Sequence, residues 1–436
     1  MREMKDSNVN WLNTIPCDWA LSRIKYVLNE RIEKNDPIKT KDILSLTAKQ
    51  GVVPLSEKEG GGNKPKEDFT AYKLAYPNDI VINSMNILSG SVGLSKYFGC
   101  VSPVYYMLRP FNDNFDVRYF NYIFQTKVFQ LSLFGLGNGI LIKESGNGKF
   151  NTIRMRIPME KFGNLLIPVP NEKEQIKISN YLDTQCSEID ATAEDIQKEI
   201  SLLEDYKKSV ITEAVTKGLN PDAEMKDSGV KWLPKIPKHW KVIPSKYLFA
   251  NSDIRRQTGD EQLTASQKYG IITQKDYTAK ENAQIVLATQ GLEKWKHVEP
   301  NDFIISLRSF QGGLEMSEIT GCITWHYVVL KAQKKVYHKY YKWLFKSARY
   351  INALQGTCNF IRDGQDLRFS NFALVPLFEL PLEEQQQIAD YLDTKCSEID
   401  TLIADKKRQL DILTDYKKSL IYEYITGKKE VPVKDF

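Results

Sequence analysis

The chain carries one sequence frame twice, and this repeat limits the folds that its 436 residues can adopt. Residues 4–19 (MKDSNVNWLNTIPCDW) match residues 225–240 (MKDSGVKWLPKIPKHW) at ten of sixteen positions, with an offset of 221. Residues 181–190 (YLDTQCSEID) match residues 391–400 (YLDTKCSEID) at nine of ten positions, with an offset of 210. The ends of the two repeats therefore agree while the segments between them have diverged, which indicates one architecture used twice with two different middle segments.

The middle segments still predict a shared fold. Residues 79–86 and 100–108 of the first repeat are rich in β-branched and aromatic side chains, as are residues 302–307 and 322–330 of the second. All four segments therefore predict strands. We expect each middle segment to form a mixed α/β domain of about 150 residues.

An amphipathic helix follows these strands in each repeat. Its apolar residues recur at helical spacing, which predicts one helix with a single face in the core. That face comprises Phe120, Ile123, Phe124, Val128 and Leu131 in the first repeat, and Tyr340, Trp343, Leu344, Ile351 and Leu354 in the second.

A longer helix closes each repeat. Acidic first turns at Glu172–Gln175 and Glu383–Gln386 predict where these helices begin, because carboxylates favour the positive end of a helix dipole. Apolar residues then recur with the 4–3 spacing of a coiled coil, and residues 185–217 alone would make about 50 Å of helix. Because an isolated coiled-coil helix needs a partner, we expect the two helices to pair antiparallel with each other. The predicted seam residues are Ile189, Ile196, Ile200, Leu203 and Val210 in the first helix, and Ile399, Ile403, Leu410, Leu413 and Leu420 in the second.

Two lysines, Lys207 and Lys417, occupy matched positions on this seam. Their long side chains can extend to solvent from a partly apolar position. Alternatively, a single polar residue on a seam can fix the register of paired helices. The sequence leaves both interpretations open.

These elements predict a mixed α/β (α+β) chain with two globular domains separated by two long antiparallel coiled-coil helices, and a pseudo-twofold axis relating the two repeats. We place the first domain at residues 1–165 and the first helix at residues 166–221. The second domain spans residues 222–375 and the second helix residues 376–436.

The sequence contains no catalytic motif. Phosphate-binding GxxxxGK[ST], nucleophile-elbow GxSxG and zinc-binding HExxH patterns are absent, and the four histidines lack metal-ligand spacing. The glycine-rich residues 135–139 follow a helix pattern, which favours a surface loop over a nucleotide site. Residues 221–226 (PDAEMK) superficially resemble a nuclease motif, but their carboxylates lie too close in sequence to come from separate strands. We therefore expect a binding protein without an active site, a metal or a cofactor of its own.

Composition bears on the compartment and the partners. No run of about 18 apolar residues predicts a membrane span, and the N-terminus lacks the apolar core of a signal peptide. None of the six cysteines forms a CxxC pair, so we expect reduced cysteines in a cytoplasmic protein. The matched Cys100 and Cys322 are interpreted as small buried residues. The formal net charge of +5 neither requires nor excludes nucleic acid as a partner.

Polar loops in both repeats are candidates for DNA contact. They lie at residues 60–66 and 143–156 in the first repeat, and at residues 255–274, 306–311 and 357–368 in the second. They combine Lys and Arg, which pair with guanine or phosphate, with Asn and Gln, which pair with adenine. Solvated surface loops have a similar composition, so the prediction depends on the occurrence of such loops in both repeats and not on any single residue. The candidate DNA-binding residues are Lys64, Lys66, Lys143, Asn147, Lys149, Asn151, Arg154, Arg255, Arg256, Gln267, Lys268, Gln274, Arg308, Gln311, Asn359, Arg362, Gln365 and Arg368.

With the repeat established, the chain resembles the specificity (S) subunit of a type I restriction–modification enzyme over essentially its whole length. The proline-ended strand before each long helix carries part of the resemblance, as does the opening from Val9 to Trp19 with its twin from Val230 to Trp240. The first opening departs from the pattern at Asn8 and Cys17, where the second has Gly229 and Lys238. The remaining motifs are Glu174-Gln175-Ile176, Tyr181-Leu182-Asp183 and Ile189-Asp190, with copies at Glu384-Gln385, Tyr391-Leu392-Asp393 and Ile399-Asp400.

This resemblance implies a non-catalytic subunit that recognises a DNA sequence. The two middle domains would be target recognition domains, each reading one half of an asymmetric, bipartite site in double-stranded DNA. The helices would set the spacing and dock two modification (methyltransferase) subunits. Those partners would bring S-adenosylmethionine and methylate adenines, and restriction/motor subunits, where present, would bring ATP and Mg²⁺. No cofactor in this chain and no membrane partner are expected.

Two further hypotheses belong to other classes. The chain could be a non-catalytic protein–protein scaffold with two docking domains on a coiled-coil spacer, which the modest charge permits. Salt-dependent retention on DNA separates this scaffold from a DNA reader, because phosphate contacts weaken as salt rises. A standalone nuclease is the third hypothesis, and cutting of DNA by the purified chain with Mg²⁺ would support it.

Overall fold

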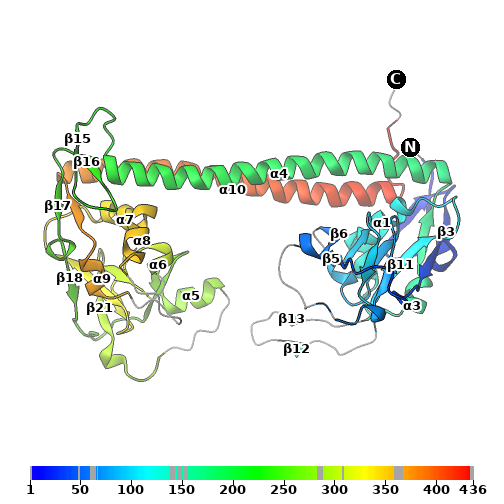
Figure 1. Cartoon of the computed structure of the whole chain (residues 1–436), viewed down its shortest axis with the longest axis horizontal. Helices are drawn as coiled ribbons and strands as arrows, with labels where there is room; N and C mark the ends of the chain where they lie inside the picture. Colours follow the sequence, from blue (N-terminus) through cyan, green and yellow to red (C-terminus); the bar gives the residue numbers. More distant parts are fainter. Residues whose placement is uncertain are drawn as a thin grey trace. The chain divides into compact units, whose positions relative to one another are not determined.

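The computed structural model describes residues 2–47, 50–58, 65, 67–137, 143–144, 150–151, 156–281, 288–306, 309–357 and 367–432, and among these it shows a mixed fold of helices and antiparallel strands (Figure 1). The chain divides into two compact units. Unit 1 comprises Met1–Ile196 with Arg408–Phe436, and unit 2 comprises Gln197–Lys407. Each unit contains a globular domain together with one part of each of two long helices.

Unit 1 is built around a four-stranded antiparallel sheet with the order β4 (Leu28–Arg31), β11 (Tyr105–Pro110), β8 (Ile80–Asn83) and β9 (Val92–Leu94). Its two-stranded pairs are β1 (Met4–Asp6) with β2 (Thr14–Pro16), β3 (Ala20–Arg23) with β14 (Leu166–Val169), β5 (Leu44–Thr47) with β6 (Gly51–Pro54), β7 (Lys73–Ala75) with β10 (Gly99–Val101), and β12 (Lys143–Glu144) with β13 (Phe150–Asn151). Its short helices are α1 (Val117–Gln125), α2 (Lys127–Ser132) and α3 (Met159–Gly163), with 3₁₀ turns η1 (Ile24–Tyr26), η2 (Leu55–Glu57), η3 (Phe69–Ala71) and η4 (Ile87–Ser89).

Unit 2 repeats this plan. Its four-stranded sheet has the order β18 (Phe249–Ser252), β25 (Val328–Ala332), β22 (Phe303–Ile305) and β23 (Glu315–Met316). Its pairs are β15 (Met225–Asp227) with β16 (Lys235–Pro237), β17 (Lys241–Ile243) with β26 (Leu377–Glu379), β19 (Leu263–Ser266) with β20 (Gly270–Thr273), and β21 (Lys296–Val298) with β24 (Gly321–Ile323). Its short helices are α5 (Gln274–Glu281), α6 (Ser309–Gly312), α7 (His338–Lys346), α8 (Ala348–Gln355) and α9 (Phe369–Ala373), with 3₁₀ turns η5 (Ser245–Tyr247) and η6 (Leu292–Lys294).

Two long helices complete the units, α4 (Glu172–Lys217) and α10 (Leu382–Ile425). Both begin at the acidic turns that the sequence predicts. Within unit 1 they run antiparallel, because Asp190 of α4 meets Lys417 of α10 while Tyr181 meets Tyr424. Within unit 2 they also run antiparallel, since Lys207 meets Asp400 while Glu199 meets Lys406. The predicted fold class is therefore confirmed at the level of each unit.

Each unit has one large core that joins the globular domain to both helices. In unit 1 this core contains Trp19 and Tyr119 of the domain, Leu182 of α4 and Ile425 of α10. The matched core of unit 2 contains Trp240, Tyr340, Leu392 of α10 and Val215 of α4. A smaller core lies beneath the β5–β6 hairpin in unit 1, and another beneath the β19–β20 hairpin in unit 2. Cys100 and Cys322 are fully buried, as predicted.

The prediction of one continuous amphipathic helix is wrong in both repeats. In unit 1 the chain leaves the helical conformation at Thr126, whose hydroxyl accepts a hydrogen bond from the amide of Phe129 and so caps a second helix, α2. Ser347 separates α7 from α8 in the same way in unit 2. The break rotates the second helix, so that Phe129 is buried while Val128 and Leu131 are exposed. Local capping therefore overrides the periodicity of the apolar residues.

Candidate functional site

The start of each long helix is fastened to its domain by the Glu-Gln dipeptide that carries part of the family resemblance. In unit 1 the indole Nε1 of Trp19 donates to Glu174 (2.9 Å), which also pairs with Arg2. The buried Gln175 donates to the carbonyl of Pro170 (2.8 Å) and accepts from the amide of Asp116 (3.0 Å). The buried indole of Trp19 and the buried amide of Gln175 thereby have hydrogen-bond partners.

Unit 2 reproduces these contacts with its own residues. Trp240 donates to Glu384 (3.0 Å), and Gln385 donates to the carbonyl of Leu380 (2.8 Å) and accepts from the amide of Tyr337 (2.8 Å). The exposed ring of His239 takes the place of Arg2, at 2.7 Å from Glu384. The repeated tryptophan and the Glu-Gln dipeptide therefore attach the domain to the start of the long helix in each unit.

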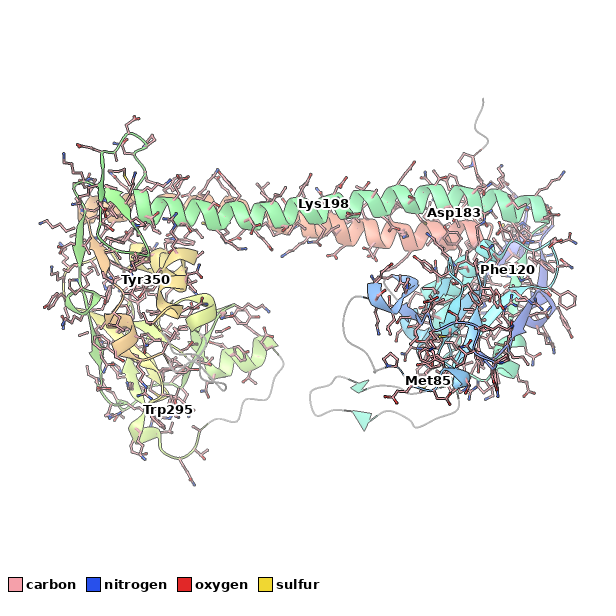
Figure 2. The ribbon with its side chains drawn as sticks, in the orientation of Figure 1. Met85, Phe120, Asp183, Lys198, Trp295 and Tyr350 are labelled. Atoms are coloured by element: carbon pink, nitrogen blue, oxygen red, sulfur yellow. The ribbon has the colours of Figure 1, made fainter. Side chains whose placement is uncertain are left out.

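The aspartate of each Tyr-Leu-Asp block forms a second attachment. In unit 1 the carboxylate of Asp183 accepts from Tyr122 Oη (2.7 Å) and from Arg118 (2.8 Å), both on α1. Figure 2 shows Asp183 on the stretch of α4 that lies over the domain containing Phe120. Burial and the hydrogen bond to Asp183 raise the pKa of Tyr122, so its hydroxyl stays protonated and remains a donor.

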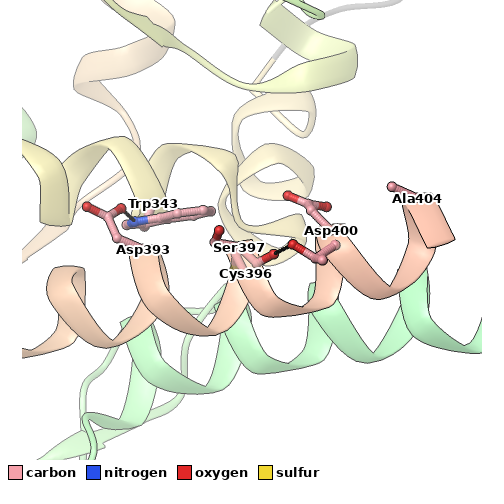
Figure 3. A pocket seen from close by; sticks show the side chains of 7 residues that line it. Trp343, Asp393, Cys396, Ser397, Asp400 and Ala404 are labelled. Carbon is pink, nitrogen blue, oxygen red and sulfur yellow. Dashed lines mark hydrogen bonds between the residues drawn. The ribbon is translucent and has the colours of Figure 1, made fainter.

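In unit 2 the same carboxylate is held by different donors. Asp393 accepts from the indole Nε1 of Trp343 (2.9 Å) and from Lys339 Nζ (3.0 Å), both on α7. Figure 3 shows Trp343 and Asp393 at one end of a shallow pocket of about 460 Å³ that continues past Cys396 to Asp400. An aromatic donor and a cation thus bind one aspartate in both units, although no donor residue is identical.

A third attachment joins each domain to the end of the helix that belongs to the other repeat. The hydroxyl of Tyr119 donates to the carbonyl of Ile425 at the end of α10 (2.8 Å). The hydroxyl of Tyr340 donates to the carbonyl of Val215 near the end of α4 (3.0 Å). Burial raises the pKa of both tyrosines well above the ordinary value, so both remain neutral donors. These carbonyls lie in the last turn of a helix, where carbonyl groups lack intrahelical partners.

The end of α10 also approaches the domain of unit 1 closely. Gly427 follows the helix with a φ of +67°, and a β-carbon there would lie 2.6 Å from Cδ of Pro16 and 3.0 Å from Trp19. The position therefore requires glycine both for its backbone conformation and for the close approach.

The two seam lysines form cross-helix ion pairs. Lys207 binds both oxygens of Asp400 at 2.7 and 2.6 Å in unit 2, and Lys417 binds both oxygens of Asp190 at 2.7 Å in unit 1. The lysine side chains are 25% and 29% exposed, so they do not simply extend into solvent. Each pair joins matched positions of the two helices, which favours the register interpretation.

The predicted seam residues face the partner helix to different degrees. Ile196 and Leu420 in unit 1, and Ile200, Ile399 and Ile403 in unit 2, are buried. The other seam residues are half-buried: Ile189, Leu410 and Leu413 in unit 1, and Leu203 and Val210 in unit 2.

The candidate DNA-binding residues fall into two groups. Lys64, Lys66, Asn147, Lys149, Arg154, Arg308, Asn359, Arg362 and Gln365 lie outside the described residues, and the side chains of Lys143, Asn151 and Gln311 do as well. The described candidates, Arg255, Arg256, Gln267, Lys268, Gln274 and Arg368, all belong to unit 2.

Arg255 and Arg256 lie beside the segment that leads into β21. Arg255 is exposed and donates through Nη1 to the carbonyl of Lys294 (2.9 Å). The backbone amide of Arg256 donates to the carbonyl of Trp295 (2.9 Å), and its side chain is also exposed. The side chain of Trp295 itself is buried. Both guanidinium groups therefore retain donors that face solvent.

The other candidates of this loop gather at the β19–β20 hairpin. Gln267 lies against Gly312 of α6, so this part of the 255–274 loop approaches α6. Lys268 pairs with Glu281 (2.8 Å) and lies 4.8 Å from the centroid of the Tyr269 ring, and the hydrogen bonds to Glu281 and Tyr269 raise its pKa, so it stays cationic. Gln274 is half-buried at the start of α5, and the exposed Arg368 directly precedes α9.

Sequence reasoning missed the attachments made by Tyr119 and Tyr340. Both tyrosines recur at the offset of 221 that relates the repeat openings, so a search for identities within the divergent segments could have found them. It also missed Trp325, whose ring is 50% exposed and stacks on His326 with centroids 3.5 Å apart. Among the described residues, no group of three or more His, Cys, Asp or Glu side chains could hold a metal ion. No described helix combines the length and apolarity that a bilayer span requires.

The fold and its contacts define a class: a tandem-repeat protein in which two unlike domains are built by equivalent contacts onto the same pair of long helices. No known family profile matches the chain. A curated relative from Methanocaldococcus jannaschii, named "Putative type I restriction enzyme MjaX specificity subunit", is 23% identical over 279 residues. The match covers 62% of this chain and 60% of the relative, which is less than two thirds of the relative's length.

Solved structures extend the similarity over nearly the whole chain. A chain from a structure on complex assembly and conformational transition of the type I R-M system has a TM-score of 0.67 at 12% identity, covering 95% of this chain and 99% of that one. The HsdS subunit from Thermoanaerobacter tengcongensis has a TM-score of 0.51 at 13% identity, covering 95% and 98%. The structures show a shared fold, and together with the curated relative they confirm the resemblance to type I specificity subunits.

Proposed function

We propose that this chain is the DNA sequence-recognition subunit of a type I restriction–modification complex, and that it performs no catalytic step itself. The target recognition domains are residues 1–165 and 222–375, and each reads one half of a bipartite, asymmetric site in double-stranded DNA. The helices, residues 166–221 and 376–436, set the spacing between the half-sites and dock two modification subunits. Those partners supply S-adenosylmethionine, and restriction/motor subunits, where they join, use ATP and Mg²⁺.

One observation carries this proposal: two unlike domains are fastened to both helices by equivalent contacts. Glu174 and Glu384, Asp183 and Asp393 hold the domains in the same manner, although the loops differ. Two domains that share their contacts with the helices but differ in their loops suit the recognition of two different DNA sequences. Arg, Lys and Gln side chains at solvent-facing positions of unit 2 suit phosphate and base-edge contacts.

Support for two docked partners comes from matched apolar residues on the solvent side of the helices. In unit 2, Leu202 is 68% exposed and Tyr206, one turn later, is 50% exposed. In unit 1, the equivalent Ile412 is 61% exposed and Tyr416 is 50% exposed. Large apolar side chains at equivalent exposed positions mark an interaction surface, and here the surface occurs twice.

Two experiments test the proposal. Retention of the assembled complex on DNA should fall steeply as salt rises, whereas a protein–protein scaffold would show no such dependence. Exchanging residues 15–165 for those of a related chain should change one half of the methylated motif and leave the other half intact. A change in both halves contradicts separate reading by the two domains.

The docking role is tested by substitution of the apolar residues. Leu202→Glu and Ile412→Glu should each remove one modification subunit from the complex, and the double variant should remove both, as measured by native mass spectrometry. Lys198→Glu, which also changes an exposed residue of α4 (Figure 2), is the control and should keep both subunits. Full stoichiometry in the double variant would exclude this surface.

A further inference from the structure

Unit 2 contains an open groove of about 1150 Å³ at the C-terminal end of α4. In Figure 1 this end of α4 lies beside the β15–β16 hairpin. Val210 and Ala214 of α4 line this groove, as does Tyr391 of α10. Leu219, Met225 and Leu233 line it as well. Tyr391 is 41% exposed, Leu219 is 41% exposed and Met225 is 37% exposed, so this is apolar surface in contact with solvent.

The equivalent place in unit 1 is filled. Tyr424 of α10 stands where unit 2 has Ala214, at the offset of 210 that relates the helices. Its ring lies against Tyr181, the equivalent of Tyr391, with centroids 4.6 Å apart and the two hydroxyls 3.3 Å apart. Tyr424 is 5% exposed and belongs to the large core of unit 1.

At this position the two units therefore differ by one phenol ring. In unit 1, a tyrosine side chain covers the ring of the Tyr-Leu-Asp block. In unit 2 that side chain is shortened to a methyl group, and Tyr391 lines the groove. Unit 1 therefore shows that a phenol ring fits against the tyrosine of the Tyr-Leu-Asp block.

The rim of the groove carries positive charge. Lys217 pairs with Glu213 (2.9 Å), whereas Lys235 and Arg349 have no ion pair among the described residues. Both of these side chains are exposed. The rim would therefore favour a group that brings a negative charge beside the apolar lining.

We propose that this groove binds a tyrosine side chain presented by a partner protein, with a carboxylate next to that tyrosine lying toward Arg349 and Lys235. The ring packs on Tyr391 above Ala214, as Tyr424 packs on Tyr181 in unit 1. This inference goes beyond the proposed function and does not depend on DNA recognition. The two units are consequently unequal: unit 1 carries its own tyrosine, and unit 2 receives one.

The first test uses p-cresol, which is the tyrosine side chain alone, titrated into the full chain. Methyl NMR of Met225 should show a saturable shift in the native chain. Ala214→Tyr supplies the missing ring and should weaken this binding at least tenfold, whereas Ala191→Tyr, at an exposed position of the same helix, should leave it unchanged.

A second pair of variants keeps the test decisive if Ala214→Tyr disturbs folding. Tyr391→Ala removes the exposed aromatic ring and should weaken p-cresol binding severalfold, whereas Tyr247→Ala, at an exposed tyrosine of unit 2 outside the groove, should not. The dipeptide N-acetyl-Asp-Tyr-amide should bind more tightly than N-acetyl-Lys-Tyr-amide, and Arg349→Gln should remove that preference. Failure of p-cresol to shift Met225, or equal binding by the native chain, Ala214→Tyr and Tyr391→Ala, would overturn the proposal.

Discussion

Removing a single hydroxyl from Tyr119 should loosen the end of the helix that belongs to the other repeat. Tyr119 is fully buried, and its hydroxyl donates to the carbonyl of Ile425 (2.8 Å). In Tyr119→Phe the ring still fills the core, but the carbonyl loses its side-chain partner. A buried polar group left without its partner costs about 1–2 kcal/mol. That cost corresponds to roughly a 5- to 30-fold increase in local opening.

Hydrogen exchange measured by mass spectrometry reports such opening segment by segment. In Tyr119→Phe, peptides covering residues 418–427 should exchange faster by that factor, while peptides covering residues 208–218 should not change. Tyr340→Phe should give the reverse pattern, because its hydroxyl donates to Val215 (3.0 Å). Tyr206→Phe, at an exposed position, is the control and should leave both segments unchanged.

The result that would refute this reasoning is equally specific. Unchanged exchange at residues 418–427 in Tyr119→Phe would mean that the hydroxyl contributes nothing to holding α10. Faster exchange at the end of α4 in the same variant would mean that each domain holds its own helix end, and not that of the other repeat.

Three further predictions concern the helix pair and the thiols. Lys207→Asp should lower the free energy of unfolding by about 0.5–1 kcal/mol in urea melts, and adding Asp400→Lys should restore most of it; no restoration would exclude the ion pair as a stabilising contact. Gly427→Ala should lower stability by more than about 1 kcal/mol, because the position has a φ of +67° and no room for a β-carbon; an unchanged melting temperature would contradict this. Burial raises the pKa of Cys186 to about 11, so at pH 8 only about one thiol in a thousand is ionised and alkylation should be slow, whereas the exposed Cys17 should react quickly; equal rates measured by mass spectrometry would contradict the buried assignment.

The parts of the fold that occur in both units could be predicted, because their sequence patterns occur twice in the chain. The repeated openings, the acidic helix starts and the heptad spacing each follow from local sequence, and two copies of a weak pattern reinforce one another. The burial of Cys100 and Cys322 followed for the same reason. The predicted strands at residues 79–86 and 302–307 are confirmed as β8 and β22. The single strands predicted at residues 100–108 and 322–330 are wrong, because each segment forms two strands that pair in different sheets, β10 and β11 in unit 1 and β24 and β25 in unit 2.

The attachments between domains and helices could not be predicted in this way. Tyr119 and Ile425 lie 306 positions apart in sequence, and periodicity carries no information about such pairs. The break at Thr126 was missed because one hydroxyl decides between a continuous helix and two short ones. The ion pairs of Lys207 and Lys417 depend on the exact stagger of two antiparallel helices, which heptad counting alone does not define.

The DNA-contacting residues remain a prediction for a different physical reason. Base readout depends on where a side chain lies relative to a base edge, and composition fixes only which residue types are able to pair. Within unit 2, the candidates separate into the pair Arg255 and Arg256, the hairpin group around Gln267 and Lys268, and Arg368 before α9. Contacts to phosphate and contacts to bases are therefore expected from different parts of the same domain.

The most direct test of the central claim is a map of methylated adenines in cells that carry this chain and its modification subunit. The account predicts a bipartite motif that disappears when the gene for this chain is deleted. The double variant Arg255→Ala with Arg256→Ala should relax one half of that motif, and Lys64→Ala with Lys66→Ala should affect only the other half. Methylation that persists without the chain, or a pair of variants that each alter both halves, would contradict the assignment of one half-site to each domain.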